Sequence, residues 1–68
     1  MNAVEKIVAR NWQNHAAFNA KAALYNLQQA MQCERNDWER QSYMAHAIVF
    51  QRKAESYAKG ARAFMGLE

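Results

Sequence analysis

The sequence predicts an all-α protein: an antiparallel helical hairpin of two long helices, completed as a four-helix bundle by dimerisation. Good helix formers such as Ala, Gln, Leu and Lys are frequent, and the 68 residues include no proline and only two glycines. No segment alternates apolar and polar residues with a period of two, so no strand is expected. In the second half of the chain, apolar residues instead recur every seven positions, which is typical of packed helices.

The first helix is expected over about residues 3–33. Asn2 is followed three residues later by Glu5, which is the form of a capping box with Asn in place of Ser or Thr. The stretch from Asn11 to His15 consists mostly of mediocre helix formers, and a new helix starting there would give a three-helix alternative. Because no Gly or Pro interrupts this stretch, we favour one continuous helix.

A turn is expected at about residues 33–36, followed by a second helix over about residues 37–65. Asn36 and Glu39 repeat the capping pattern of the first helix. Gly66 is a suitable residue to end the second helix, because glycine adopts the left-handed conformation that closes many helices.

A stripe of rings and alanines is the strongest pattern in the second helix. Steps of four and three residues return to the same helix face, and here they continue for three heptads. The stripe consists of Tyr43, Ala47, Phe50, Ala54, Tyr57, Ala61 and Phe64. Alanine allows a neighbouring backbone to come close, and the rings need gaps to fill. We therefore expect this stripe to form the intrachain seam against the first helix.

The first helix contains a short stripe with the same spacing, formed by Phe18, Ala22 and Tyr25. In an antiparallel hairpin that turns near residue 35, the numbers of facing residues add up to roughly seventy. Tyr25 would then lie near Ala47. We therefore expect Phe18, Ala22 and Tyr25 to supply the first helix's side of the seam.

A second apolar face of the first helix lies roughly opposite that stripe. It includes Ala20, Leu24, Leu27 and Met31. A helix that is apolar on two faces needs two neighbours, and a hairpin supplies only one. The second helix also has apolar residues away from its main seam, which favours a second neighbour for it too. These residues are Met44, Ile48 and Val49. The face is expected to bind a second copy, as a homodimer, or to dock a different protein, and the sequence leaves both open.

Length and composition indicate one small domain, residues 1–68, with a formal charge of +3. So short a chain has a marginal core, and its single cysteine excludes an internal disulfide, which favours oligomerisation as the stabilising supplement. No apolar run reaches the roughly 20 residues that span a bilayer, and no signal peptide is visible. We therefore expect a cytoplasmic protein with no membrane partner. Leu67-Glu68 is common as a cloning remnant and receives no functional meaning.

Catalytic and metal chemistry have little support in this sequence. His15, His46 and Cys33 would lie several turns apart in the hairpin. No HExxH, CxxC, P-loop or glycine-rich phosphate loop occurs, and the carboxylates are scattered. We expect no catalytic residue, no metal site, no cofactor and no enzyme activity.

The functional expectation is therefore a non-enzymatic interaction protein that oligomerises and modulates a partner protein, as a regulator or inhibitor. Arg10 and Trp12 are close enough to form a joint partner anchor, although packing of Trp12 in the core or at its rim is the favoured interpretation. The alternative is a small, basic, dimeric nucleic-acid-binding regulator that uses the end formed by both termini. Its contacts would be Lys6, Arg10, Lys59 and Arg62, which could also simply form a solvated surface.

Overall fold

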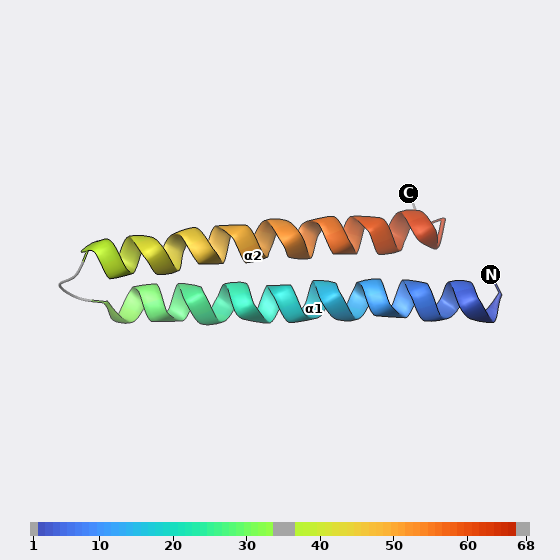
Figure 1. Cartoon of the computed structure of the whole chain (residues 1–68), viewed down its shortest axis with the longest axis horizontal. Coiled ribbons are helices and arrows are strands. Elements are labelled where there is room, and N and C mark those ends of the chain that lie inside the picture. The colour runs from blue at the N-terminus through green and yellow to red at the C-terminus, as the bar shows by residue number, and fades with distance from the viewer. Residues whose placement is uncertain (1, 34–36, 67–68) are drawn as a thin grey trace.

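The computed structural model describes residues 2–33 and 37–66, which form two antiparallel helices side by side (Figure 1). Helix α1 spans Ala3–Gln32 and helix α2 spans Asp37–Phe64. The described residues contain no strand. The predicted all-helical hairpin is therefore confirmed. The second capping pattern cannot be followed, because Asn36 and the side chain of Asp37 lie outside the described part, as do Leu67 and Glu68.

The start of α1 has the cap that the sequence predicts. Asn2 has an extended backbone, and its Oδ1 accepts a hydrogen bond of 2.8 Å from the backbone N–H of Glu5. The helix then continues through Asn11–His15 without a break, so the three-helix alternative is wrong.

The last turn of α2 closes at a glycine. Gly66 has a φ of +72°, in the left-handed region, and its N–H donates to the carbonyl of Ala63 at 3.1 Å. The N–H of Met65 donates to the carbonyl of Ala61 at 3.0 Å. These bonds occupy carbonyl groups that the end of a helix would otherwise leave without intrahelical partners.

The seam between the helices is made of alanines from both. In α1 an alanine recurs every seven residues at Ala9, Ala16, Ala23 and Ala30, and in α2 at Ala47, Ala54 and Ala61. All of these are buried except Ala16, which is half-buried. Because a methyl group occupies little space, such a seam lets two helix axes approach towards the lower limit of about 8 Å.

Along the seam, larger residues lie between successive alanines. The Trp12–Tyr57 ring contact sets a register in which Asn19 is level with Phe50 and Asn26 with Tyr43. Asn19 and Asn26 are buried, and each donates its side-chain amide to the carbonyl four residues earlier at 2.8 Å. These bonds satisfy the buried amide nitrogens within their own helix.

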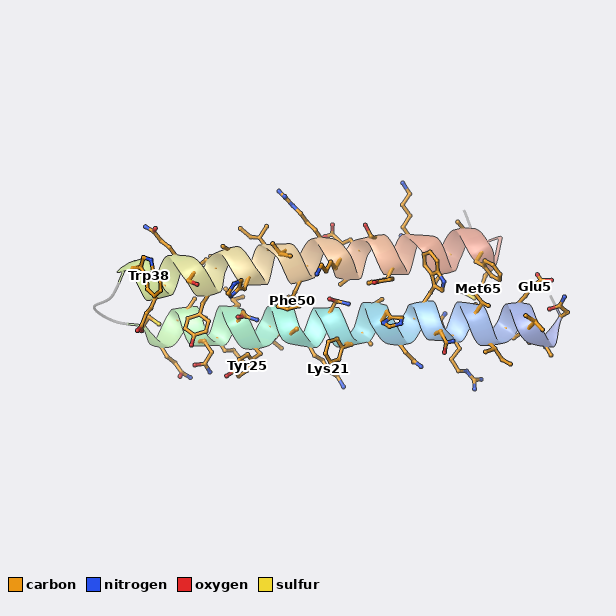
Figure 2. All side chains as sticks on the ribbon, in the orientation of Figure 1. Glu5, Lys21, Tyr25, Trp38, Phe50 and Met65 are labelled. Atoms are coloured by element: carbon orange, nitrogen blue, oxygen red, sulfur yellow. The ribbon has the colours of Figure 1, made fainter. Side chains whose placement is uncertain are left out.

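The face of α1 that forms the seam is not the one that the stripe of Phe18, Ala22 and Tyr25 predicts. Phe18 and Tyr25 are 68% and 56% exposed, and Ala22 is half-buried. Tyr25 points away from α2, whereas Phe50 points towards α1 (Figure 2). The physical reason is the alanine heptad that starts at Ala9, which allows a closer backbone approach than a face carrying two rings. This heptad has the same spacing as that of α2, so the signal was present in the sequence.

Trp12 packs against the only glycine inside a helix of the described chain, Gly60. A β carbon built on Gly60 would overlap Cζ3 and Cε3 of the Trp12 ring. The ring also meets Tyr57 edge to face, with centroids 6.1 Å apart and an interplanar angle of 80°. His15 stacks on the same tyrosine, with centroids 5.1 Å apart. Gly60, an unfavourable residue in a helix interior, is therefore explained by the space that Trp12 occupies.

The hairpin is elongated and its surface is large for its mass. Its extents are 53 × 17 × 12 Å, and its radius of gyration is 15.3 Å, against about 11 Å for a compact domain of this length. It exposes 5403 Å², whereas a compact monomer of 7.9 kDa exposes about 4400 Å². The excess of roughly 1000 Å² is the surface that a hairpin with an alanine seam leaves uncovered.

We predict that Gly60→Ala lowers the melting temperature of the protein. Alanine is the better helix former by about 1 kcal/mol, but the added methyl group would displace the Trp12 ring, and overpacking costs about 1–3 kcal/mol. Thermal melts followed by circular dichroism at one protein concentration would measure the difference. As a control, Gly60→Ala introduced into a Trp12→Ala variant should raise the melting temperature. Stabilisation in both backgrounds would contradict the packing described.

Candidate functional site

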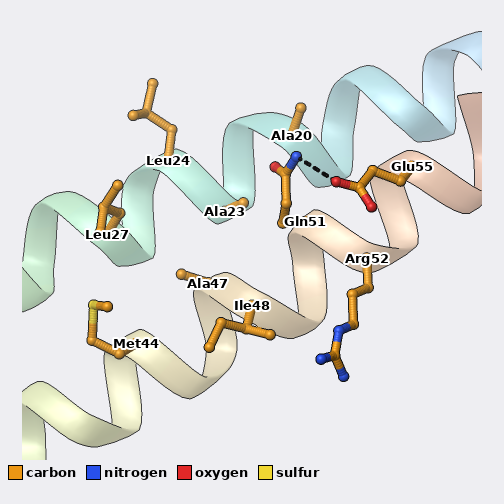
Figure 3. A pocket seen from close by; sticks show the side chains of 10 residues that line it. All are labelled: Ala20, Ala23, Leu24, Leu27, Met44, Ala47, Ile48, Gln51, Arg52 and Glu55. Atoms are coloured by element: carbon orange, nitrogen blue, oxygen red, sulfur yellow. Dashed lines mark hydrogen bonds between the residues drawn. The ribbon is translucent and has the colours of Figure 1, made fainter.

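An apolar groove runs along one flank of the hairpin, between α1 and α2 (Figure 3). Its main part has a volume of about 530 Å³, and a shallower continuation of about 350 Å³ shares Ala20, Gln51 and Glu55 with it. We call this surface the aliphatic flank. Its apolar members are Ala17, Ala20, Leu24, Leu27, Met44, Ile48 and Ala58.

The large side chains of the aliphatic flank are open to solvent on both helices. Leu24 is 55% exposed, Ile48 is 49% exposed, and Leu27 and Met44 are close to 40%. Ala23 and Ala47 lie below them, at the base of the groove (Figure 3). The flank is therefore a largely apolar surface formed by two helices, the kind of surface that a monomer rarely leaves bare.

Polar groups lie at the middle of the groove. The side-chain amide of Gln51 donates a hydrogen bond of 3.2 Å to Oε1 of Glu55, and Arg52 also contributes to the lining (Figure 3). A molecule that covers the groove must therefore leave the hydrogen bonds of these polar groups intact or replace them.

Three of the four residues predicted for a self-association or partner face lie together on this flank. Ala20, Leu24 and Leu27 line the groove. Met31 does not line the groove. It is 72% exposed and lies one turn beyond Leu27, near the end of α1. Met44 and Ile48 also line the groove and were not among the predicted site residues, although their apolar character off the seam of α2 favours a second contact surface.

The opposite flank carries two exposed rings of α1, Phe18 and Tyr25. Phe18 and Tyr25 precede the buried Asn19 and Asn26, whereas Leu24 follows the buried Ala23. Because each residue turns the helix by about 100°, these two sets fall on opposite sides of the seam. Val49 of α2 precedes the ring-bearing Phe50 in the same way and is 47% exposed. We call this second surface, formed by Phe18, Tyr25, Val49 and Phe50, the aromatic flank.

Positive charge accompanies the aromatic flank. Lys53 Nζ lies 5.7 Å from the centroid of the Phe50 ring, within the range of a cation–π contact. The side chain of Lys21, exposed on the outer side of α1, extends away from α2 (Figure 2). Rings beside lysines suit a partner surface that is both apolar and acidic.

The basic residues predicted as partner or nucleic-acid contacts gather at one end. Both termini lie at that end of the hairpin (Figure 1). Lys6, Arg10, Lys59 and Arg62 are all exposed there. Trp12, predicted as a possible partner anchor, is 39% exposed and packs within the chain on Gly60 and Tyr57.

Sites for metal chemistry are not formed by the part of the chain that the structure describes. Within residues 2–33 and 37–66, no three His, Cys, Asp or Glu side chains come together. His15 stacks on Tyr57, whereas Cys33 donates its Sγ–H to the carbonyl of Gln29 at 3.2 Å, at the far end of α1. Neither of the two described helices has the length and apolar character needed to cross a membrane.

No family model, curated protein or solved structure matches this chain. Function is therefore inferred from the two flanks and the basic end.

Proposed function

We propose that this protein is a non-enzymatic helical interaction protein that self-associates through its aliphatic flank and modulates a partner protein, as a regulator or inhibitor. The observation that carries the proposal is the groove between the helices. It presents Leu24, Leu27, Met44 and Ile48 to solvent on a largely apolar surface.

The composition of the seam supports self-association. The buried apolar residues of the described chain are all alanines, whereas most of the larger apolar side chains are exposed or half-buried. Burying apolar surface contributes roughly 25 cal/mol per Å², so covering these exposed side chains would add stabilisation that the hairpin alone does not obtain. A second copy on the aliphatic flank would bury part of it and produce a four-helix bundle.

The amount of surface is suitable for a stable dimer. Each chain exposes roughly 1000 Å² more than a compact protein of its mass. Two chains that covered this excess would together remove about 2000 Å² from water, within the range of stable, specific interfaces.

The aromatic flank is the proposed surface for the partner protein. It would stay exposed when two aliphatic flanks pair, because it lies on the other side of the seam. Exposed rings are frequent among the residues that dominate binding energy, and Phe18 and Tyr25 are such rings. The neighbouring Lys21 and Lys53 favour an acidic partner surface.

Self-association is tested by molar mass in solution. We expect light scattering on a sizing column, at several protein concentrations and two salt levels, to show a dimer for the unmodified chain. Leu24→Glu would place a charge on the aliphatic flank and should give a monomer. Gln28→Glu is the matched control, because Gln28 is exposed on the outer side of α1. A monomeric unmodified chain, or two variants of equal mass, would contradict the proposal.

Partner binding is tested by co-purification from cell lysate. The double variant Phe18→Ser with Tyr25→Ser should lose the co-purifying protein while keeping the helicity and molar mass of the unmodified chain, because both rings are already exposed. The matched double variant Asn14→Ser with Gln28→Ser changes two outer positions of α1 and should retain the partner. Equal recovery with both double variants would exclude the aromatic flank as the binding surface.

Nucleic-acid binding is the second candidate function, because the hairpin gathers four exposed basic residues at one end. It predicts that the affinity for an oligonucleotide, measured by fluorescence anisotropy, falls steeply between about 50 and 200 mM salt. Lys59→Ala with Arg62→Ala should weaken binding, whereas Lys21→Ala with Arg52→Ala, the same loss of charge elsewhere, should have a smaller effect. Absence of binding at the lower salt concentration would exclude this function.

A further inference from the structure

We infer that two copies of this chain pair head to tail, aliphatic flank on aliphatic flank, with the termini of each hairpin over the turn of its partner. This orientation rests on the proposed self-association and adds to it the direction in which the two hairpins run. A two-fold axis at right angles to the long axis of the hairpin would relate the copies, so that each contact occurs twice.

The position of the groove permits this symmetry. The groove is lined by α1 residues between Ala16 and Leu27 and by α2 residues between Met44 and Ala58. These spans are centred close to the middle of helices that run Ala3–Gln32 and Asp37–Phe64. A two-fold axis through the groove near Ala20 would therefore place one groove over the other along its whole length.

Charge selects the head-to-tail orientation over a parallel one. Among the described residues, the termini end of the hairpin carries four basic residues and one acidic residue, which are Lys6, Arg10, Lys59, Arg62 and Glu5. At the other end, the described charged residues Glu39 and Arg40 carry one charge of each sign. A parallel pair would bring the two basic ends together, whereas a head-to-tail pair separates them by the length of the hairpin.

Two of the four basic residues lie on the side where pairing would occur. Arg10 precedes the groove-lining Leu24 by fourteen residues, and Arg62 follows the groove-lining Ile48 by fourteen. Two heptads return a residue to nearly the same side of a packed helix, so both arginines extend the aliphatic flank towards the termini. Like-charge repulsion in a parallel pair would therefore act at the edge of the interface itself.

Distances between spin labels in the full-length chain test the orientation. Cys33→Ser removes the native thiol and keeps a donor for the Gln29 carbonyl. A label is then introduced at Met31→Cys, near the turn, or at Ala3→Cys, near the termini. Both positions are exposed and neutral, and both lie on the aliphatic flank, because each is separated from Leu24 or Ala17 by a multiple of seven residues.

A head-to-tail dimer predicts long distances in samples that carry a single kind of label. At 1.5 Å per residue, two labels at position 31 would be about 35 Å apart and two at position 3 about 50 Å apart. An equal mixture of the two labelled chains, after exchange of subunits, should add a short distance on the order of 20 Å, because the labelled ends would then lie side by side across packed helices.

The outcomes separate this inference from the proposal beneath it. Light scattering on each labelled sample first establishes the oligomeric state. A dimer with short distances in the single-label samples would overturn the head-to-tail orientation and leave self-association intact. A monomeric unmodified chain would overturn both.

Discussion

The rest of this hairpin depends on one constraint, the close approach of its two helix backbones. An alanine at every seventh position of each helix, on the face that meets the other helix, makes this approach possible. It explains why Ala9, Ala23 and Ala30 are buried while larger apolar residues of α1 are not. It also explains the glycine inside α2, because the Trp12 ring lies where a β carbon on Gly60 would be. Asn19 and Asn26 can be buried in the seam because the side-chain amide of each donates a hydrogen bond to a backbone carbonyl of α1.

An alanine seam has an energetic consequence for the whole molecule. It joins two long helices while burying little apolar surface, so the hairpin alone has a thin core for a chain of 68 residues. The larger side chains are displaced to the two flanks, where water reaches them. Stability and association become linked in such a design, because any molecule that covers a flank of the folded hairpin also stabilises the folded state.

The two flanks differ in chemistry, and this difference supports the proposed division of roles. The aliphatic flank is grooved and centred on the hairpin, which suits a second copy related by a two-fold axis. The aromatic flank presents separate rings beside Lys53 and Lys21, which suits an acidic surface of another protein. The basic end belongs to both interpretations, since it can orient two hairpins or attract an anionic partner.

The sequence by itself determined the helices, the cap at Asn2 and the glycine that ends α2, because these depend on local backbone preferences and on spacing. It also indicated the apolar residues Leu24 and Leu27 that line the groove. The tertiary structure alone decided which face of α1 meets α2. Periodicity shows which residues share a helix face, and α1 has a ring stripe and an alanine stripe of equal period. The choice between them depends on how closely two backbones can approach, and only the packed pair of helices reveals that distance.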